Sequence, residues 1–76
     1  MVTTTVRRQV QELFLAARDR GLTDYEIRSI LGHSESTTRP RRIELERDGV
    51  IIRTGARRLA VGRSANVFVA RQFTAR

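Results

Sequence analysis

The sequence contains no cysteine and no lysine, and it has one proline and one histidine among its 76 residues. Without cysteine no disulfide framework can form, and the single histidine, His33, cannot supply a Cys/His metal site. A chain this short buries only about 60% of the surface that its unfolded form exposes, so it has room for one small core. The sequence therefore predicts one domain that is stabilised by packing alone and takes no metal or cofactor.

Long hydrophobic runs are lacking as well. The longest is LFLAA, at residues 13–17, whereas a membrane-spanning helix needs about 20 apolar residues. The N-terminal residues, MVTTTVRRQV, do not contain the apolar region of a signal peptide. We therefore expect no membrane partner and a cytoplasmic location, associated with the nucleoid if the chain binds DNA.

Catalytic motifs are also missing from the sequence. There is no Ser/His/Asp set and no phosphate-binding loop of the G-x-x-x-x-G-K type. The acids Glu44, Glu46 and Asp48 follow one another in a charged segment, at spacings that do not bring them to one site. The sequence predicts no enzymatic activity, and a nuclease or recombinase activity would have to belong to a larger parent protein.

Acidic residues are absent from the last third of the chain. The net charge is +7 and the sequence pI about 11.7. Residues 1–48 hold nine arginines and all eight acids, whereas residues 49–76 hold six arginines and no acid. A genome rich in G and C would explain the exclusive use of arginine, but guanidinium groups also bind phosphates and guanine edges at two points. The charge indicates a polyanionic partner.

Apolar spacing predicts two helices in the first part of the chain. Residues 4–20 carry a stripe at steps of three and four, which is typical of a helix with one buried face. This stripe consists of Val6, Val10, Leu13, Phe14 and Ala17. Thr23 and Glu26 have the spacing of a capping box, which predicts a second helix over residues 24–31. Its expected inner face carries Ile27, Ile30 and Leu31.

The segment GHSESTTRPRRIELERDG, residues 32–49, predicts a third helix over about 35–48 and contains the only proline. If Ser34 caps this helix, Pro40 lies inside it and its missing N–H leaves a carbonyl without a partner. If Thr37 is the cap, Pro40 falls in the first turn, where its N–H would have had no helical partner. The spacing allows both starts.

Residues after Gly49 are rich in β-branched side chains. VIIRT and NVFVA predict two strands, over about 50–54 and 66–71. The basic stretch between them, 55–65, predicts a long loop. Phe73 is placed where it can fold back on the core.

The run GLTDYEIRSILGHSESTTRPRRIELERDGVI closely resembles winged helix-turn-helix DNA-binding domains of the MarR-like kind, including small ones that bacteriophages and other mobile elements encode. Those domains commonly show GLT-(D/E)-x-E-I-x-x-x-L-G in the second helix, a serine or threonine at the start of the third, and E-L-x-x-x-G-x-I at its exit. The likeness covers residues 21–54 and, more loosely, NVFVA. Arg42 departs from it, because related domains often bury an aliphatic residue there.

The resemblance implies an α+β fold: a three-helix winged helix-turn-helix with a two-stranded β-hairpin as the wing. The third helix would enter the DNA major groove, and the wing would contact the backbone or the minor groove. The expected DNA-binding residues of the helix are Ser36, Thr37, Arg39, Arg41, Arg42 and Arg47. Those of the wing are Arg57, Arg58 and Arg63.

Roles within this set differ. Arg39 is the favoured base reader, because it projects away from the core where related domains contact bases. Arg41 and Arg42 flank the core side, so they contact phosphates or pair with Glu44 and Glu46. The arginines of the expected loop have no acid nearby in sequence and are suited to phosphates or a narrow minor groove.

The leading hypothesis is sequence-preferring binding of double-stranded DNA by a small transcriptional regulator or an accessory factor in replication or recombination. The alternatives are a winged-helix protein-interaction module, which outward apolar residues such as Ile43, Leu59 and Val61 would favour, and the DNA-targeting domain of a larger enzyme. The short segment 71–76 offers little length for a dimerisation helix, so we expect a monomer or a dimer that forms on DNA.

Overall fold

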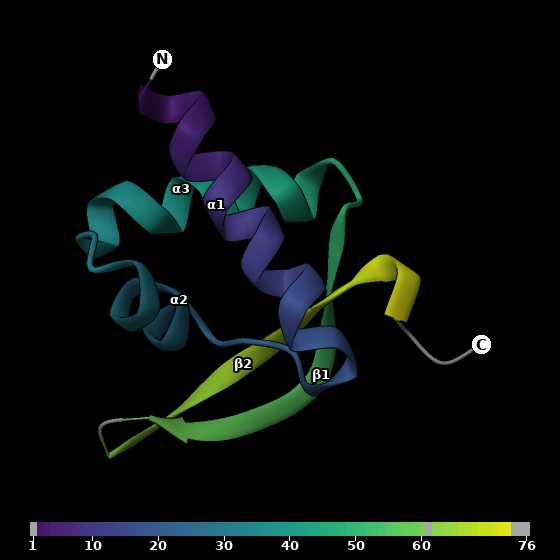
Figure 1. Cartoon of the computed structure of the whole chain (residues 1–76). Helices are drawn as coiled ribbons and strands as arrows, with labels where there is room; N and C mark the ends of the chain where they lie inside the picture. The colour runs from purple at the N-terminus through teal and green to yellow at the C-terminus, as the bar shows by residue number, and fades with distance from the viewer. Residues whose placement is uncertain (1, 61, 74–76) are drawn as a thin grey trace.

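The computed structural model describes residues 2–60 and 62–73, which form three α-helices followed by a two-stranded antiparallel hairpin (Figure 1). The elements are α1 (Val2–Ala17), η1 (Arg18–Arg20), α2 (Asp24–Leu31), α3 (Glu35–Arg47), β1 (Ile51–Ala60), β2 (Arg63–Ala70) and η2 (Arg71–Phe73). The layout is α+β, as predicted. No helix in these residues is long and apolar enough to cross a membrane.

Helix α1 packs across α3 and supplies much of the core (Figure 1). Val6, Val10 and Phe14 are buried, which confirms the predicted stripe. The α-helix ends at Ala17, earlier than the expected residue 20, and a 3-10 turn follows. The reason lies in the backbone, because Arg18 has a φ of 55° and leaves the helical path.

Gly21 lets the chain pass tightly against the hairpin. Its φ is 72°, and a Cβ atom there would lie 2.4 Å from the carbonyl oxygen of Phe68. The next residue, Leu22, exchanges two backbone hydrogen bonds with Phe68, both with an N–O distance of 2.8 Å. The segment between α1 and α2 thus pairs with β2 through one isolated antiparallel β-bridge.

The predicted capping box of α2 is present. The Thr23 hydroxyl accepts from Glu26 N at 3.2 Å, and Thr23 N donates to the Glu26 carboxylate at 3.0 Å. Ile27 is buried, but the prediction for Ile30 was wrong, because that side chain is 58% exposed. Helical geometry explains the error: Ile27 and Leu31 lie about 40° apart around the axis, whereas Ile30 is turned about 100° from Leu31.

Helix α3 begins after Ser34, which decides between the two predicted starts. The backbone N–H groups of Thr37 and Thr38 donate to Ser34 O at 3.0 and 3.1 Å. Pro40 therefore lies inside the helix and cannot donate to the carbonyl of Ser36. The helix ends at Arg47, one residue earlier than predicted.

The hairpin differs from the prediction. Residues 55–65 do not form a long loop, because β1 and β2 continue through most of them in a register from Ile51↔Ala70 to Ala60↔Arg63. An irregularity in pairing falls between Arg53 and Arg57. Val61, part of the expected loop, lies outside the described residues. The second strand stops at residue 70, since Arg71 begins η2, and Phe73 packs against the core as predicted.

Candidate nucleic-acid interface

Helix α3 has an inner and an outer face. Thr38, Arg42 and Leu45 are buried, whereas Arg39, Ile43 and Arg47 are exposed. Ser36 also lies outside. The predicted outward positions of Arg39 and Ile43 are thereby confirmed, and the outer face combines hydroxyl, guanidinium and apolar groups.

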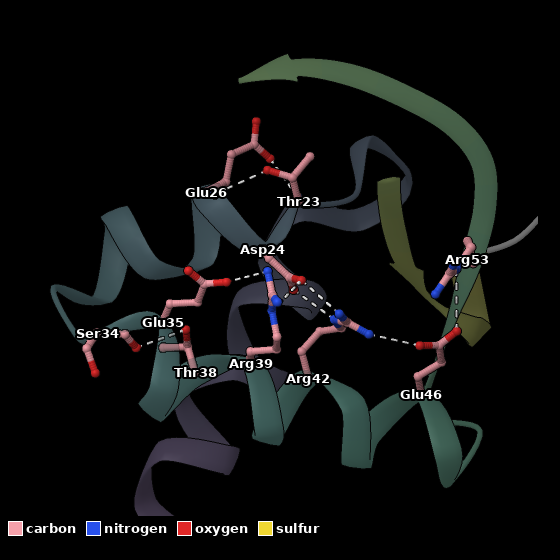
Figure 2. Close-up of polar contacts among 10 residues, drawn as sticks. All are labelled: Thr23, Asp24, Glu26, Ser34, Glu35, Thr38, Arg39, Arg42, Glu46 and Arg53. Carbon is pink, nitrogen blue, oxygen red and sulfur yellow. Dashed lines mark hydrogen bonds and ion pairs between the residues drawn. The ribbon is translucent and has the colours of Figure 1, made fainter. Parts of the chain in front are cut away.

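Arg39 lies at the edge of the outer face, beside α2. Its side chain is 51% exposed and forms ion pairs with Glu35 and, at 3.7 Å, with Asp24 (Figure 2). Ion pairs this exposed are worth only about 0–1 kcal/mol. Arg39 can therefore exchange these carboxylates for another acceptor at little cost.

Arg42 does not belong to the outer face: of its two predicted roles, the pair with Glu46 is confirmed, whereas the DNA contact stays a prediction that its 8% exposure does not favour. Its Nε and Nη2 donate to the Asp24 carboxylate at 2.7 and 2.8 Å, and its Nη1 donates to Glu46 at 3.0 Å (Figure 2). Its guanidinium also lies 4.3 Å from the ring centroid of Phe68. The hydrogen bonds to Asp24 raise the pKa of Arg42 despite its burial. Arg42 is thus buried at the position where the resemblance led us to expect an aliphatic residue. Its charge is accommodated by the hydrogen bonds to Asp24 and Glu46.

Arg41 takes the second of its two predicted roles, a pair with an acid. It donates to Glu44 at 2.7 Å, and its side chain is only 18% exposed. Arg7 of α1 reaches the same carboxylate at 3.4 Å and Asp48 at 2.9 Å, and this second hydrogen bond lowers the pKa of Asp48. Arg47 also contacts Asp48, at 3.3 Å, yet remains 70% exposed. Of these arginines, Arg47 is the one that faces solvent.

Hydroxyl groups gather at the first turn of α3. The Ser34 hydroxyl lies 3.0 Å from those of both Ser36 and Thr37. Each hydroxyl can donate or accept, so the cluster can turn a donor outward. Ser36 is exposed and Thr37 half-buried.

Arg57 lies flat across the hairpin. Its Nε and Nη2 donate to the hydroxyl and carbonyl oxygens of Ser64 at 2.9 and 3.0 Å, and its Nη1 donates to Asn66 Oδ1 at 2.8 Å. These acceptors are neutral, so the contacts hold the guanidinium of Arg57 in one orientation without compensating its positive charge. Arg63 is exposed and has no partner among the described residues.

Arg58 is not a free cation of a loop, contrary to the prediction. It donates to Glu26 at 2.6 Å and to the carbonyl oxygen of Arg20 at 2.7 Å. Burial raises the pKa of Glu26, but hydrogen bonds from the Thr23 backbone and from Arg58 outweigh this effect and keep the pKa below its ordinary value. Arg58 thus connects the hairpin to α2. Arg53 lies 3.7 Å from Glu46, which leaves Arg57 and Arg63 as the hairpin arginines without an acidic partner among the described residues.

A cleft of about 340 Å³ lies between α3 and the hairpin. Arg39 lines it from the helix, and Arg57, Ser64 and Asn66 line it from the hairpin. Asp24 forms part of its wall and is already paired with Arg42. The cleft therefore brings the favoured arginine of the helix and the fixed arginine of the hairpin to one concave surface.

Sequence reasoning missed three of these residues. Asp24 orients Arg39 and Arg42, and a signal for it existed, because an arginine on the inner stripe of α3 requires an acidic partner. Ser64 and Asn66 hold Arg57 through pairing across the hairpin, which no local pattern indicates. Within residues 2–60 and 62–73, no group of three or more His, Cys, Asp or Glu side chains could hold a metal ion.

No model of a known protein family matches the chain, and no curated protein matches its sequence.

Proposed function

We propose that the chain binds double-stranded DNA with sequence preference, as a winged helix-turn-helix domain with α3 in the major groove and the hairpin as the wing. The observation that carries the proposal is the cleft where Arg39 of α3 and Arg57 of the hairpin face one surface. An α-helix with its side chains is about 10–12 Å wide, and the major groove is about 12 Å wide. The hairpin would then lie against the flanking backbone or the minor groove.

The arrangement of α2 and α3 supports this proposal. Only residues 32–34 separate the two helices, and Gly32 has a φ of 73°, which produces a tight turn of the kind that a helix-turn-helix unit needs. Leu22 joins the hairpin at Phe68. The Asp24–Arg42 pair connects α2 to α3 beneath the outer face, so the helix and the hairpin are held in a fixed relation.

Charge supports the same partner. The hairpin contains no acid, and the acids of α3 are each engaged by an arginine. Arg39 is suited to guanine, whose O6 and N7 accept two hydrogen bonds from one guanidinium. Arg57 and Arg63 are suited to phosphates, which position a protein without reading sequence. Such a domain would serve as a transcriptional regulator or as an accessory factor in replication or recombination, in a bacteriophage or its host, as a monomer or a dimer formed on DNA.

The decisive experiment selects bound sequences from a pool of random duplexes and then measures affinity for the enriched site by fluorescence anisotropy at several salt concentrations. If the domain contacts about six phosphates, a plot of the logarithm of the binding constant against the logarithm of the salt concentration should have a slope of about −5. A two-fold symmetric motif would indicate a dimer on DNA, and a short asymmetric one a monomer. An absence of binding at low salt, or an affinity that ignores salt, would reject the proposal.

A protein-interaction module is the second candidate, and one observation favours it. Leu59 on β1 is 75% exposed, so a partner protein could cover this apolar side chain. Leu59→Ser distinguishes the two functions: it should leave duplex affinity nearly unchanged, whereas a docking function through the hairpin would be lost.

A further inference from the structure

The centre of the outer face of α3 is apolar. Pro40 and Ile43 lie there, with Ser36 on one side of them along the helix and Arg47 on the other. Ile43 is 47% exposed. Both side chains line a shallow hollow along α3, together with Ser36 and Arg39. A helix that used only hydrogen bonds to read DNA would carry polar groups at this position.

Folding does not explain this exposed isoleucine. Ile43 belongs neither to the buried core cluster nor to the partly buried side chains that pack against it. It does not pack under the hairpin either, because other residues line the cleft between α3 and the hairpin. Its side chain is therefore available to a partner of α3.

We propose that Ile43, assisted by the ring of Pro40, contacts the C5-methyl group of a thymine beside the base that Arg39 reads. This inference rests on the proposed DNA binding and specifies the sequence that the domain prefers. In the major groove, thymine alone among the four standard bases presents a methyl group. An apolar side chain placed against the other edges would leave their acceptors or amino groups without hydrogen bonds, which costs free energy. The apolar centre thus selects thymine both by contact and by exclusion.

The surroundings favour DNA over a protein as the occupant. Arg39 and Arg47 flank the apolar centre. Two acids line the hollow, and each keeps an arginine partner when Arg39 turns to a base: Glu44 pairs with Arg41, and Glu35 pairs with Arg28 as well as with Arg39. Two apolar side chains are also far too few for a stable protein contact, which buries about 800 Å² on each partner.

The test removes the methyl group from DNA and the isoleucine from the protein. Each thymine of the selected site is replaced in turn by deoxyuridine, which lacks only the C5-methyl, and affinity is measured by fluorescence anisotropy. Burying one methyl group is worth about fourfold in affinity. We expect deoxyuridine to weaken binding about fourfold at one thymine, and Ile43→Ala to abolish this difference at the same position.

Ile30→Ala is the matched control, because it removes the same atoms from an isoleucine that is 58% exposed on α2. It should leave the preference for thymine over deoxyuridine intact. Equal binding of thymine and deoxyuridine sites by the unmodified chain, or a preference that survives Ile43→Ala, would overturn this inference while leaving DNA binding in place. Failure to bind any duplex would overturn both. Self-association of the free chain that Ile43→Ala abolishes would assign the isoleucine to a second copy instead.

Discussion

Arg42 and Asp24 form a two-point ion pair, with Nε–Oδ1 and Nη2–Oδ2 distances of 2.7 and 2.8 Å, that joins α3 to α2 at a partly buried position (Figure 2). The same arginine donates to Glu46, and Arg53 of β1 lies 3.7 Å from that second acid. Its guanidinium packs on Phe68 of β2. One side chain therefore links both helices and the hairpin.

We expect Arg42→Ala to lower the free energy of unfolding by about 2–3 kcal/mol. Removing one member of a fully buried ion pair costs about 3–5 kcal/mol, and we expect a smaller loss here because solvent reaches Asp24, whose side chain is 22% exposed. Arg42→Lys should recover only part of the loss, because an ammonium group cannot form the two-point contact. Urea unfolding gives the values, with Arg8→Ala on the surface of α1 as the control. Equal effects of Arg42→Ala and Arg8→Ala would mean that the network contributes nothing to stability.

Local patterns predicted the local structure well, whereas pairings between distant residues could not be read from the sequence. The Thr23–Glu26 box and the stripe of α1 depend on residues three or four apart, and both are confirmed. The side chains of Arg42 and Arg58 reach acids 18 and 32 residues away, and the local geometry of a helix or strand places such a residue on a face without indicating its partner. The length of the hairpin could not be predicted for the same reason. The first strand was expected to end at residue 54, where glycine and arginine follow the β-branched residues, but pairing with the second strand extends it to Ala60.

Glu26 should make stability depend on pH in the acidic range. Its pKa in the folded chain lies below the ordinary value of 4.5, so its stabilising contribution is complete above that value and is lost as the pH falls through the folded-state pKa. We expect Glu26→Gln to be less stable than the parent near neutral pH, and the difference to shrink on acidification. Urea unfolding between neutral pH and about pH 3 tests this. Glu12→Gln, exposed on α1, is the control, and a constant gap between Glu26→Gln and the parent would contradict the prediction.

Neighbouring arginines of β1 should separate binding from stability. Arg57→Ala, and likewise Arg63→Ala, should weaken binding to all duplexes and reduce the salt slope by about one, because each removes a phosphate contact. Arg58→Ala should instead lower the free energy of unfolding by about 1 kcal/mol, since it removes the hydrogen bond to Glu26, and change duplex affinity little. Anisotropy and urea unfolding of each variant decide the matter. If Arg58→Ala weakened binding as much as Arg57→Ala at equal stability, the hairpin would meet DNA with its other side.

Arg39→Ala should relax base preference at one position of the selected site. Its guanidinium is the candidate reader of a guanine, and one good two-point contact is worth about 1–3 kcal/mol of discrimination. Affinities for the selected site and for single-base variants measure the effect. Arg47→Ala, at the other end of the same face, is the comparison. A uniform loss of affinity for all sequences would make Arg39 a phosphate contact instead.

Pro40→Ala should stabilise the chain and change what it binds. The alanine N–H can donate to the carbonyl of Ser36, which the proline leaves without its helical partner. Proline inside a helix costs about 3 kcal/mol relative to alanine, but its rigidity in the unfolded chain offsets up to about 1 kcal/mol, so we expect a net gain of about 2–3 kcal/mol. The regular hydrogen bond should also alter the path of the first turn and reposition Ser36 and Arg39, which selection from random duplexes would detect. Ser29→Ala, exposed on α2, raises helix propensity without touching α3 and controls for stability alone. If Pro40→Ala kept the parental site preference, the proline would not orient the residues that face DNA.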